Sequence, residues 1–193
     1  MSARIVVSSD DRDILRLAES RGCDGVLRPQ ALCADHSTTI AAVIHALIHL
    51  ANCGDLPDAI CLLQPTNPLR LPKDVDAAVA IMQHYGCGSV ITHSPARCHP
   101  ARQIWADTLE PLLESYTANR PRQELRPVFD RDGSVYLTRV DVLRKGTFYS
   151  LDGRILIIPP RRHLDIETKH DLKVAEYLMW RRIIARQARK RKP

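Results

Sequence analysis

Short apolar runs rich in β-branched residues alternate along the chain with longer stretches of helical periodicity, and this alternation limits the folds open to it. Runs that end in polar residues predict strands at residues 4–8, 59–63, 89–92, 134–138 and 155–158. Apolar residues recurring on one face predict helices at residues 13–21, 38–52, 73–85 and 168–189. Strands that alternate with helices predict an α/β domain with a mainly parallel sheet and right-handed crossovers.

The basic charge is concentrated near the C-terminus. The 193 residues carry 28 Lys and Arg against 22 Asp and Glu, a net charge of +6. Seven basic residues and no acidic one follow Trp180: Arg181, Arg182, Arg186, Arg189, Lys190, Arg191 and Lys192. Without them, 21 basic side chains remain against 22 acidic ones, so the rest of the chain has a net charge of −1. Such a run usually forms a solvated helix end, and nucleic-acid binding through a basic tail, residues 181–193, is the lesser functional alternative.

Composition also restricts the compartment. No apolar run reaches the roughly 18 residues that a membrane-spanning helix needs, and residues 1–11 lack the features of a signal peptide. We therefore expect a cytoplasmic protein, without membrane insertion, whose six cysteines are reduced. None of these cysteines forms a C-x-x-C pair, which argues against a zinc site, and their apolar neighbours predict that they fill the core.

Polar residues follow the predicted strands, at the edge where parallel α/β sheets bind ligands. The segment LLQPTNPLR places Gln64, Thr66 and Asn67 on a loop fixed by two prolines, and Arg70 adds a guanidinium suited to a carboxylate or phosphate. Residues 35–39 are polar at a predicted helix start, where hydroxyl and N–H groups would meet an anion or nucleobase, or simply cap the helix.

Two carboxylates, Asp165 and Glu167, are separated by one residue just before the last predicted helix. In an extended chain both would project from the same side and approach one Mg²⁺ ion, which prefers oxygen ligands. The same residues also have an ordinary explanation, because Asp165 or Thr168 would cap the helix and Glu167 would interact favourably with its dipole.

Taken in order, several segments resemble the CMP-sialic acid synthetase family, the acylneuraminate cytidylyltransferases. The segments are VVSSDD, RPQALCADHSTT, LLQPTNPLR, CHP, PRQELRPVFDRDGSVYLTR, GTFYS and LDIETKHDL. The resemblance implies a Rossmann-like, mainly parallel sheet of the nucleotide-diphospho-sugar transferase type. Residues 1–180 would form the nucleotidyltransferase-like domain, in which residues 93–130 include an extended arm that reaches the partner subunit of a homodimer.

The family's reaction joins CMP from CTP to a sialic or related nonulosonic acid and releases pyrophosphate. The resemblance implies that Arg28 and Thr39 lie against the cytidine half of the nucleotide. It also implies that Asp165 and Glu167 are the catalytic carboxylates that carry Mg²⁺ on the triphosphate. Most of the catalysis would then come from positioning the two substrates and from neutralising the negative charge on the phosphates.

The acidic sugar would occupy a second group of residues. The resemblance implies that Gln64 holds the acyl group of the sugar. Arg122 would face the sugar's carboxylate, and Tyr136 and the pair Phe148 and Tyr149 would surround its apolar side.

The chain departs from the family pattern at three places. The family's opening strand and the glycine-rich, Lys- and Arg-bearing loop that cradles the triphosphate have no counterpart here. Glu167 stands where the family has Asp. Asp132 stands where the family has Asn, which would bring a carboxylate toward an acidic sugar.

Three hypotheses account for these departures: Met1 lies inside a longer protein, the chain is a catalytically silent homologue, or it cradles the triphosphate in another way. A non-catalytic nucleotide- or sugar-binding homologue is therefore the main alternative to the enzyme.

Overall fold

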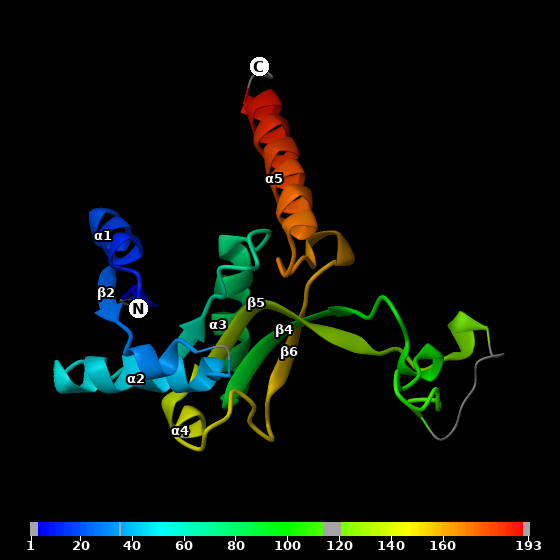
Figure 1. Ribbon diagram of the computed structural model, residues 1–193, viewed down its shortest axis with the longest axis horizontal. Coiled ribbons are helices and arrows are strands. Elements are labelled where there is room, and N and C mark those ends of the chain that lie inside the picture. Colours follow the sequence, from blue (N-terminus) through cyan, green and yellow to red (C-terminus); the bar gives the residue numbers. More distant parts are fainter. Residues whose placement is uncertain (1–3, 35, 114–120, 191–193) are drawn as a thin grey trace. The chain divides into compact units, whose positions relative to one another are not determined.

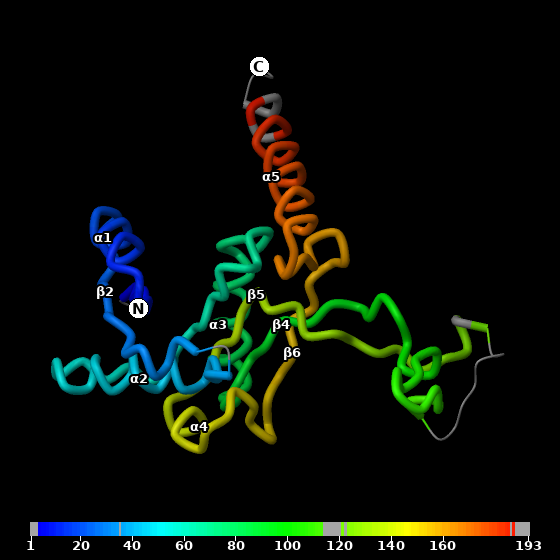
Figure 2. The backbone as a smooth tube through the Cα atoms, viewed as in Figure 1, coloured from blue at the N-terminus to red at the C-terminus, as the bar shows by residue number. Residues whose placement is uncertain are grey.

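The structure, a computed structural model, describes residues 4–34, 36–113 and 121–190 (Figures 1 and 2). The chain divides into two compact units. The first comprises Met1–Leu62, Tyr85–Ser89 and Leu137–Gly153, and the second comprises Leu63–His84, Val90–Tyr136 and Arg154–Pro193.

The first unit begins with a strand, a helix and a second strand. Strands β1 (Val6–Ser9) and β2 (Asp24–Leu27) pair in parallel, and α1 (Arg12–Ser20) connects them. The side chain of Asp11 accepts the backbone N–H groups of Asp13 and Ile14 at 2.7 and 3.3 Å, which fixes the start of α1.

Two further α-helices and another strand also belong to this unit. Helix α2 (Thr39–Asn52) begins after Thr38, whose hydroxyl accepts the N–H of Ala41 at 3.4 Å. Helix α4 (Val140–Leu143) starts where Val140 N–H donates to the carbonyl of Asp58 at 3.0 Å, just before β3 (Ala59–Leu62).

A four-stranded sheet has the order β3-β5-β4-β6. Strands β4 (Ser89–Pro95) and β6 (Arg154–Ile157) are parallel neighbours, and β5 (Phe129–Arg139) is the longest strand. The remaining long helices are α3 (Pro72–Tyr85) and α5 (Lys169–Lys190). Short 3₁₀ helices lie at Gln30–Leu32, Pro100–Arg102, Arg122–Glu124 and Pro160–Arg162.

The core of the second unit lies around β4 and β5. Val90 and Val135 are fully buried, and Leu69 and Ile158 are 1% exposed. Thr92, also fully buried, accepts the N–H of Val135 at 2.8 Å and donates to its carbonyl at 3.2 Å. This hydroxyl therefore replaces a backbone partner inside the sheet, where an unpaired N–H would be costly.

After β4, the described segment 96–113 leaves the four-stranded sheet and projects away from strands β4 and β5 (Figure 1). A bridge between Ile104 and Pro111 folds it back on itself. Three of its apolar side chains are exposed: Ile104, Trp105 and Leu109 are 53, 54 and 70% exposed.

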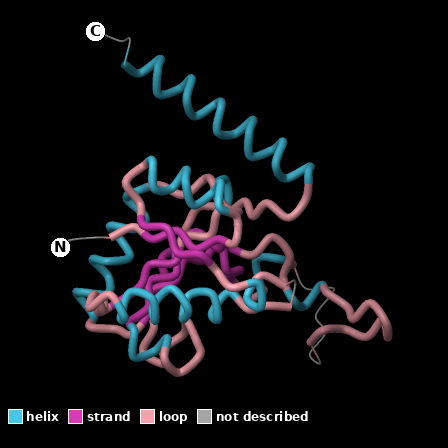
Figure 3. The backbone as a smooth tube through the Cα atoms, turned by 60° about the vertical axis from the view of Figure 1, so that its left-hand side comes forward, coloured by secondary structure: helices cyan, strands magenta, loops and turns pink. Residues whose placement is uncertain are grey.

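The predicted α/β alternation is confirmed, and the four predicted long helices match α1, α2, α3 and α5 within one residue at each end. Helix α5 (a long cyan helix in Figure 3) continues through residues 181–190, so the basic tail begins inside this helix. None of the described helices has the length and apolarity of a membrane span.

The prediction that the cysteines fill the core is wrong for most of them. Cys87 is buried, whereas Cys53 and Cys98 are exposed and the other three are partly exposed. Cys53 follows the last residue of α2, and Cys98 lies on the projecting segment, so neither position has a core to fill.

Candidate active site

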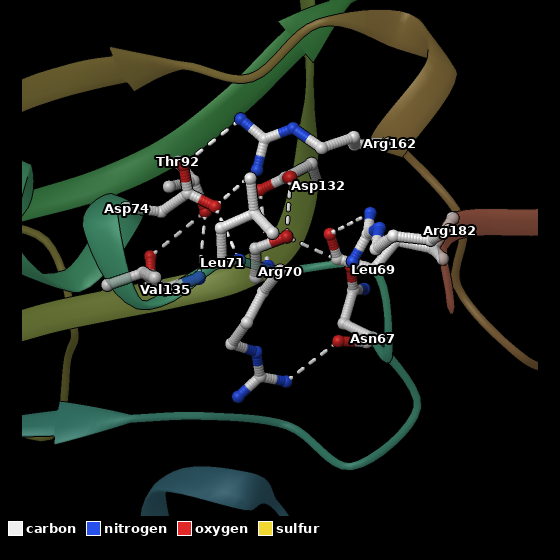
Figure 4. Close-up of polar contacts among 11 residues, drawn as sticks. Asn67, Leu69, Arg70, Leu71, Asp74, Thr92, Asp132, Val135, Arg162 and Arg182 are labelled. Atoms are coloured by element: carbon white, nitrogen blue, oxygen red, sulfur yellow. Dashed lines mark hydrogen bonds and ion pairs between the residues drawn. The ribbon is translucent and has the colours of Figure 1, made fainter. Parts of the chain in front are cut away.

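The loop after β3 is held in shape by its own arginine. Arg70 donates from its guanidinium to the carbonyl of Asn67 at 3.0 Å (Figure 4) and to that of Gln64, and Asn67 N–H donates to the carbonyl of Gln64 at 3.3 Å. Arg70 thus serves the loop backbone, whereas the sequence suggested that it would meet a carboxylate or phosphate. The consequence is a preformed loop with the Gln64 side chain half-buried at its start.

Glycine at position 133 allows this loop to lie against β5. Gly133 has a φ of +73°, and a Cβ there would lie 2.7 Å from Nδ2 of Asn67 and 3.1 Å from Oε1 of Gln64. A side chain would clash with the carboxamide of Asn67 and would lie tightly against that of Gln64. The close approach therefore requires glycine for space as well as for conformation.

The carboxylate of Asp132 is directed into the protein interior. Asp132 is 1% exposed and accepts the N–H and the hydroxyl of Ser134 at 3.2 and 2.7 Å. The Ser134 hydroxyl also lies 3.0 Å from Oδ1 of the fully buried Asn67. The expectation that Asp132 would point toward a bound sugar is wrong, because Ser134 holds the carboxylate inside the strand.

The segment that carries the two predicted metal ligands is joined to the same loop. Ile166 donates its N–H to the carbonyl of Thr66 at 2.9 Å. Asp165 and Glu167, on either side of Ile166, are exposed, and their carboxylates have no hydrogen-bond or ion-pair partner among the described residues. The structure therefore brings together the loop of Gln64 and the segment of the two carboxylates.

The start of α5 is capped by other residues. Asp171 N–H donates to Oγ1 of Thr168 at 3.2 Å, and Asp171 Oδ2 accepts the N–H and hydroxyl of Thr168 at 2.8 and 2.7 Å. These bonds, first that from the Thr168 side chain, hold the pKa of Asp171 below its ordinary value. Because Thr168 and Asp171 cap the helix, Asp165 and Glu167 are not used for that purpose.

The two free carboxylates fit the way in which proteins hold Mg²⁺. That ion keeps several waters and takes one or two carboxylates together with substrate phosphates. Among the described residues, no group of three or more His, Cys, Asp or Glu side chains lies together as a complete metal site. The donor set is thus suited to an ion that arrives with a phosphorylated substrate.

The two predicted cytidine-binding residues belong to the first unit. Arg28 follows β2 and donates to the carbonyl and hydroxyl of Ser8 at 2.7 and 3.3 Å, which ties it to the end of β1. Thr39 is exposed at the first position of α2. Since the neighbouring Thr38 caps the helix, the hydroxyl of Thr39 is not needed as the cap.

The other residues predicted to bind the sugar do not all belong to one unit. Tyr136 is half-buried on β5 in the second unit. Phe148 is half-buried in the first unit, where its carbonyl accepts the hydroxyl of Thr138 at 3.0 Å, and Tyr149 is 43% exposed. Arg122 begins a 3₁₀ helix, but its side chain lies outside the described part of the structure.

Sequence reasoning missed a buried ion pair beside the loop. Asp74 accepts two N–H groups of Arg162, one at 3.0 Å, and the N–H of Leu71 at 2.7 Å (Figure 4). The Asp74 and Arg162 side chains are only 6 and 12% exposed. An acid two residues after Pro72 signals a helix cap, but no feature of the sequence marks Arg162 as its partner.

Comparison with known proteins agrees with the sequence motifs. No protein-family model matches the chain. The CMP-N,N'-diacetyllegionaminic acid synthase of Legionella pneumophila is 29% identical over 188 residues, covering 91% of this chain and 77% of that protein. The N-acylneuraminate cytidylyltransferase of Escherichia coli is 27% identical over 181 residues, covering 88% of this chain but only 35% of that longer protein.

A solved structure has the same fold. CMP:2-keto-3-deoxy-manno-octonic acid synthetase, in complex with CTP, superposes with a TM-score of 0.65 at 14% identity. The match covers 93% of this chain and 82% of that one, which confirms the predicted α/β fold. The predicted resemblance is likewise confirmed: along most of its length, the chain is similar to the cytidylyltransferases of the CMP-sialic acid synthetase family.

Proposed function

We propose that the chain is a cytidylyltransferase that joins CMP from CTP to a nonulosonic acid and releases pyrophosphate. The observation that carries this proposal is the junction of three segments in the second unit. The loop of Gln64 lies against Gly133 of β5, and Thr66 of the same loop binds Ile166 between the two exposed carboxylates. This arrangement supports a sugar-binding carboxamide beside a pair of carboxylates that would hold the Mg²⁺ of the bound triphosphate.

Each residue has a role that its chemistry can perform. Gln64 donates to and accepts from the acyl amide of the sugar, and Tyr136 packs on its apolar side. Asp165 and Glu167 hold Mg²⁺, which neutralises phosphate charge when it is bound with CTP. Glu167 reaches one methylene further than the Asp of the family, so the oxygens remain available at a slightly different distance.

The remaining proposed contacts are to the cytidine and to the sugar. Arg28 and Thr39 bind the cytidine half. Arg122 pairs with the sugar carboxylate through a charge-assisted hydrogen bond. Phe148 and Tyr149 present aromatic faces to the sugar.

We also propose that the projecting segment between β4 and β5 is the arm of a homodimer. Ile104, Trp105 and Leu109 are each more than half exposed. Apolar side chains gathered on one exposed segment are favourable sites for contact with another protein, because the contact removes them from water. Sedimentation of the parent and of a Trp105→Ala and Leu109→Ala double variant would test this. A parent that stays monomeric at micromolar concentration would exclude the dimer.

The enzymatic proposal is tested by release of pyrophosphate from CTP and a panel of nonulosonic acids with Mg²⁺. We expect release that depends on both the acid and the metal. Gln64→Ala should raise KM for the sugar acid, whereas Gln83→Ala, an exposed glutamine on α3, should leave it unchanged. Binding of CTP or CMP-sugar without turnover would instead establish the non-catalytic homologue. The cytoplasmic localisation stays a prediction.

A further inference from the structure

A basic pocket lies in the second unit, beside the loop but on different side chains from those proposed for the sugar. The cavity has a volume of about 540 Å³. Its basic lining comes from three segments: Lys73 at the start of α3, Arg161 and Arg162 of a 3₁₀ helix, and Arg181 and Arg182 of α5. Side chains far apart in the sequence therefore converge on one space.

Two of the five cations are already fixed in place. Arg162 is neutralised by its buried pair with Asp74. Arg182 donates to the carbonyl of Leu69 at 3.0 Å, which holds α5 at the pocket and orients the guanidinium without removing its charge (Figure 4).

The other three cations have no anionic partner among the described residues. Lys73, Arg161 and Arg181 form no ion pair within the described part of the chain. Arg181 lies 5.9 Å over the ring of Tyr177, a contact that leaves its N–H groups open. No Asp or Glu is among the described residues that line the pocket.

Such a gathering of like charge is unfavourable by itself. Lys73, Arg161 and Arg181 are exposed and Arg182 is half-buried, so water and salt screen part of the repulsion among these four positive charges, while their fields add in the concave space between them. An anion that enters the pocket removes this repulsion. Guanidinium groups bind phosphate through paired N–H donors, and the lysine adds a mobile point charge.

We propose that the basic pocket binds a small oligophosphate, an anion with two or three linked phosphate groups. A cavity of this size lies in the range that holds small molecules and exceeds what a single phosphate needs. The convergent, concave arrangement favours a compact anion over an extended nucleic-acid backbone. The inference does not rest on the proposed cytidylyltransferase activity.

Calorimetric titration of the full chain with inorganic tripolyphosphate tests the proposal. We expect binding that weakens as salt is added, because the attraction is electrostatic. The double variant Lys73→Ala and Arg161→Ala should weaken it by about tenfold or more, since each removed cation contributes a charge-assisted hydrogen bond.

The matched control removes the same number of charges elsewhere. Lys173 on α5 and Arg102 are exposed and lie outside the pocket, so Lys173→Ala with Arg102→Ala should leave the affinity within about twofold of the parent. Thermal unfolding of both double variants shows whether each is folded.

A second measurement uses a tryptophan adjacent in sequence to a residue that lines the pocket. Trp105 and Trp180 are the two tryptophans, so Trp105→Phe leaves Trp180, next to Arg181, as the single tryptophan, which can be excited selectively over the five tyrosines. Its emission should change on addition of tripolyphosphate and not in the Lys73→Ala and Arg161→Ala background. The proposal is overturned if the parent does not bind, if both double variants lose affinity equally, or if the chain binds DNA but not tripolyphosphate.

Discussion

The two terminal guanidinium nitrogens of Arg162 donate hydrogen bonds to the carboxylate of Asp74, although the two residues are 88 positions apart in the chain. The same carboxylate accepts the N–H of Leu71 and so also holds the turn that leads into α3. One buried acid therefore joins the start of α3 to the segment between β6 and α5 within the second unit.

Removing this acid should destabilise the protein strongly. Asp74→Ala leaves Arg162 buried without a partner, which costs about 3–5 kcal/mol in the free energy of unfolding. Urea denaturation measures the loss. Asp76→Ala, an exposed residue on the same helix, should change stability by less than about 0.5 kcal/mol. Equal losses in the two variants would contradict the role of the pair.

Gly133 should be intolerant of a side chain for two separable reasons. Gly133→Ala combines an unfavourable backbone conformation, about 1–3 kcal/mol, with a collision against Asn67 and a tight contact with Gln64. Gly146 has a similar φ of +76°, but a Cβ at that position would meet nothing within 4 Å among the described residues. Gly146→Ala therefore measures the conformational cost alone, and the extra loss in Gly133→Ala, seen in thermal unfolding, measures the collision.

Thr92 should be needed for its hydroxyl. Thr92→Val keeps the shape but leaves the buried N–H and carbonyl of Val135 without their side-chain partner, at a cost of about 1–3 kcal/mol. Thr92→Ser keeps the oxygen and should recover a large part of that stability in equilibrium unfolding. A valine variant as stable as the parent would show that the two bonds contribute nothing.

The N-terminus of α5 should respond to acid. Because hydrogen bonds from Thr168 lower the folded pKa of Asp171 below its ordinary 3.8, this carboxylate contributes stability above that value and loses it as the pH falls through the folded pKa. Helicity followed by circular dichroism during acidification should therefore decrease less in Asp171→Asn than in the parent. An identical acid titration in both proteins would contradict this assignment.

The proposed metal ligands should matter for turnover and not for folding. Asp165→Asn should lower pyrophosphate release by about tenfold or more, since Mg²⁺ neutralisation of phosphate charge contributes several kcal/mol. Added Mg²⁺ should partly restore the rate. Asp76→Asn, also exposed, is the matched control, and unchanged thermal unfolding of Asp165→Asn separates catalysis from stability.

The sequence predicts those parts of the fold that depend on local patterns. Helices α1 and α2 begin beside Asp11 and Thr38, whose types and positions signal caps. Strand β2 is absent from the predicted strands because it is four residues long and begins with Asp24 and Gly25, which are uncommon in strands.

The site is only partly predictable, because some of its features depend on local patterns and others on contacts between residues far apart in the sequence. The polar loop of Gln64 and the pair of carboxylates stand out because they follow strands in extended chain. Strand β5, however, begins at Phe129, earlier than predicted, because the charged residues before Gly133 give no strand signal. The inward direction of Asp132 depends on Ser134 and Asn67, and the latter lies 67 positions away from Ser134.

The contact of Gly133 with Gln64 and Asn67 also has a consequence for how this protein can vary. A smaller residue at position 67 would relieve the clash that a side chain at position 133 makes with Asn67, although the backbone cost at a φ of +73° would remain. The order of substitutions then decides which are tolerated, so the three positions should vary as a set. Glycine at position 133 therefore preserves the space that the carboxamide of Gln64 occupies, although glycine has no side chain of its own.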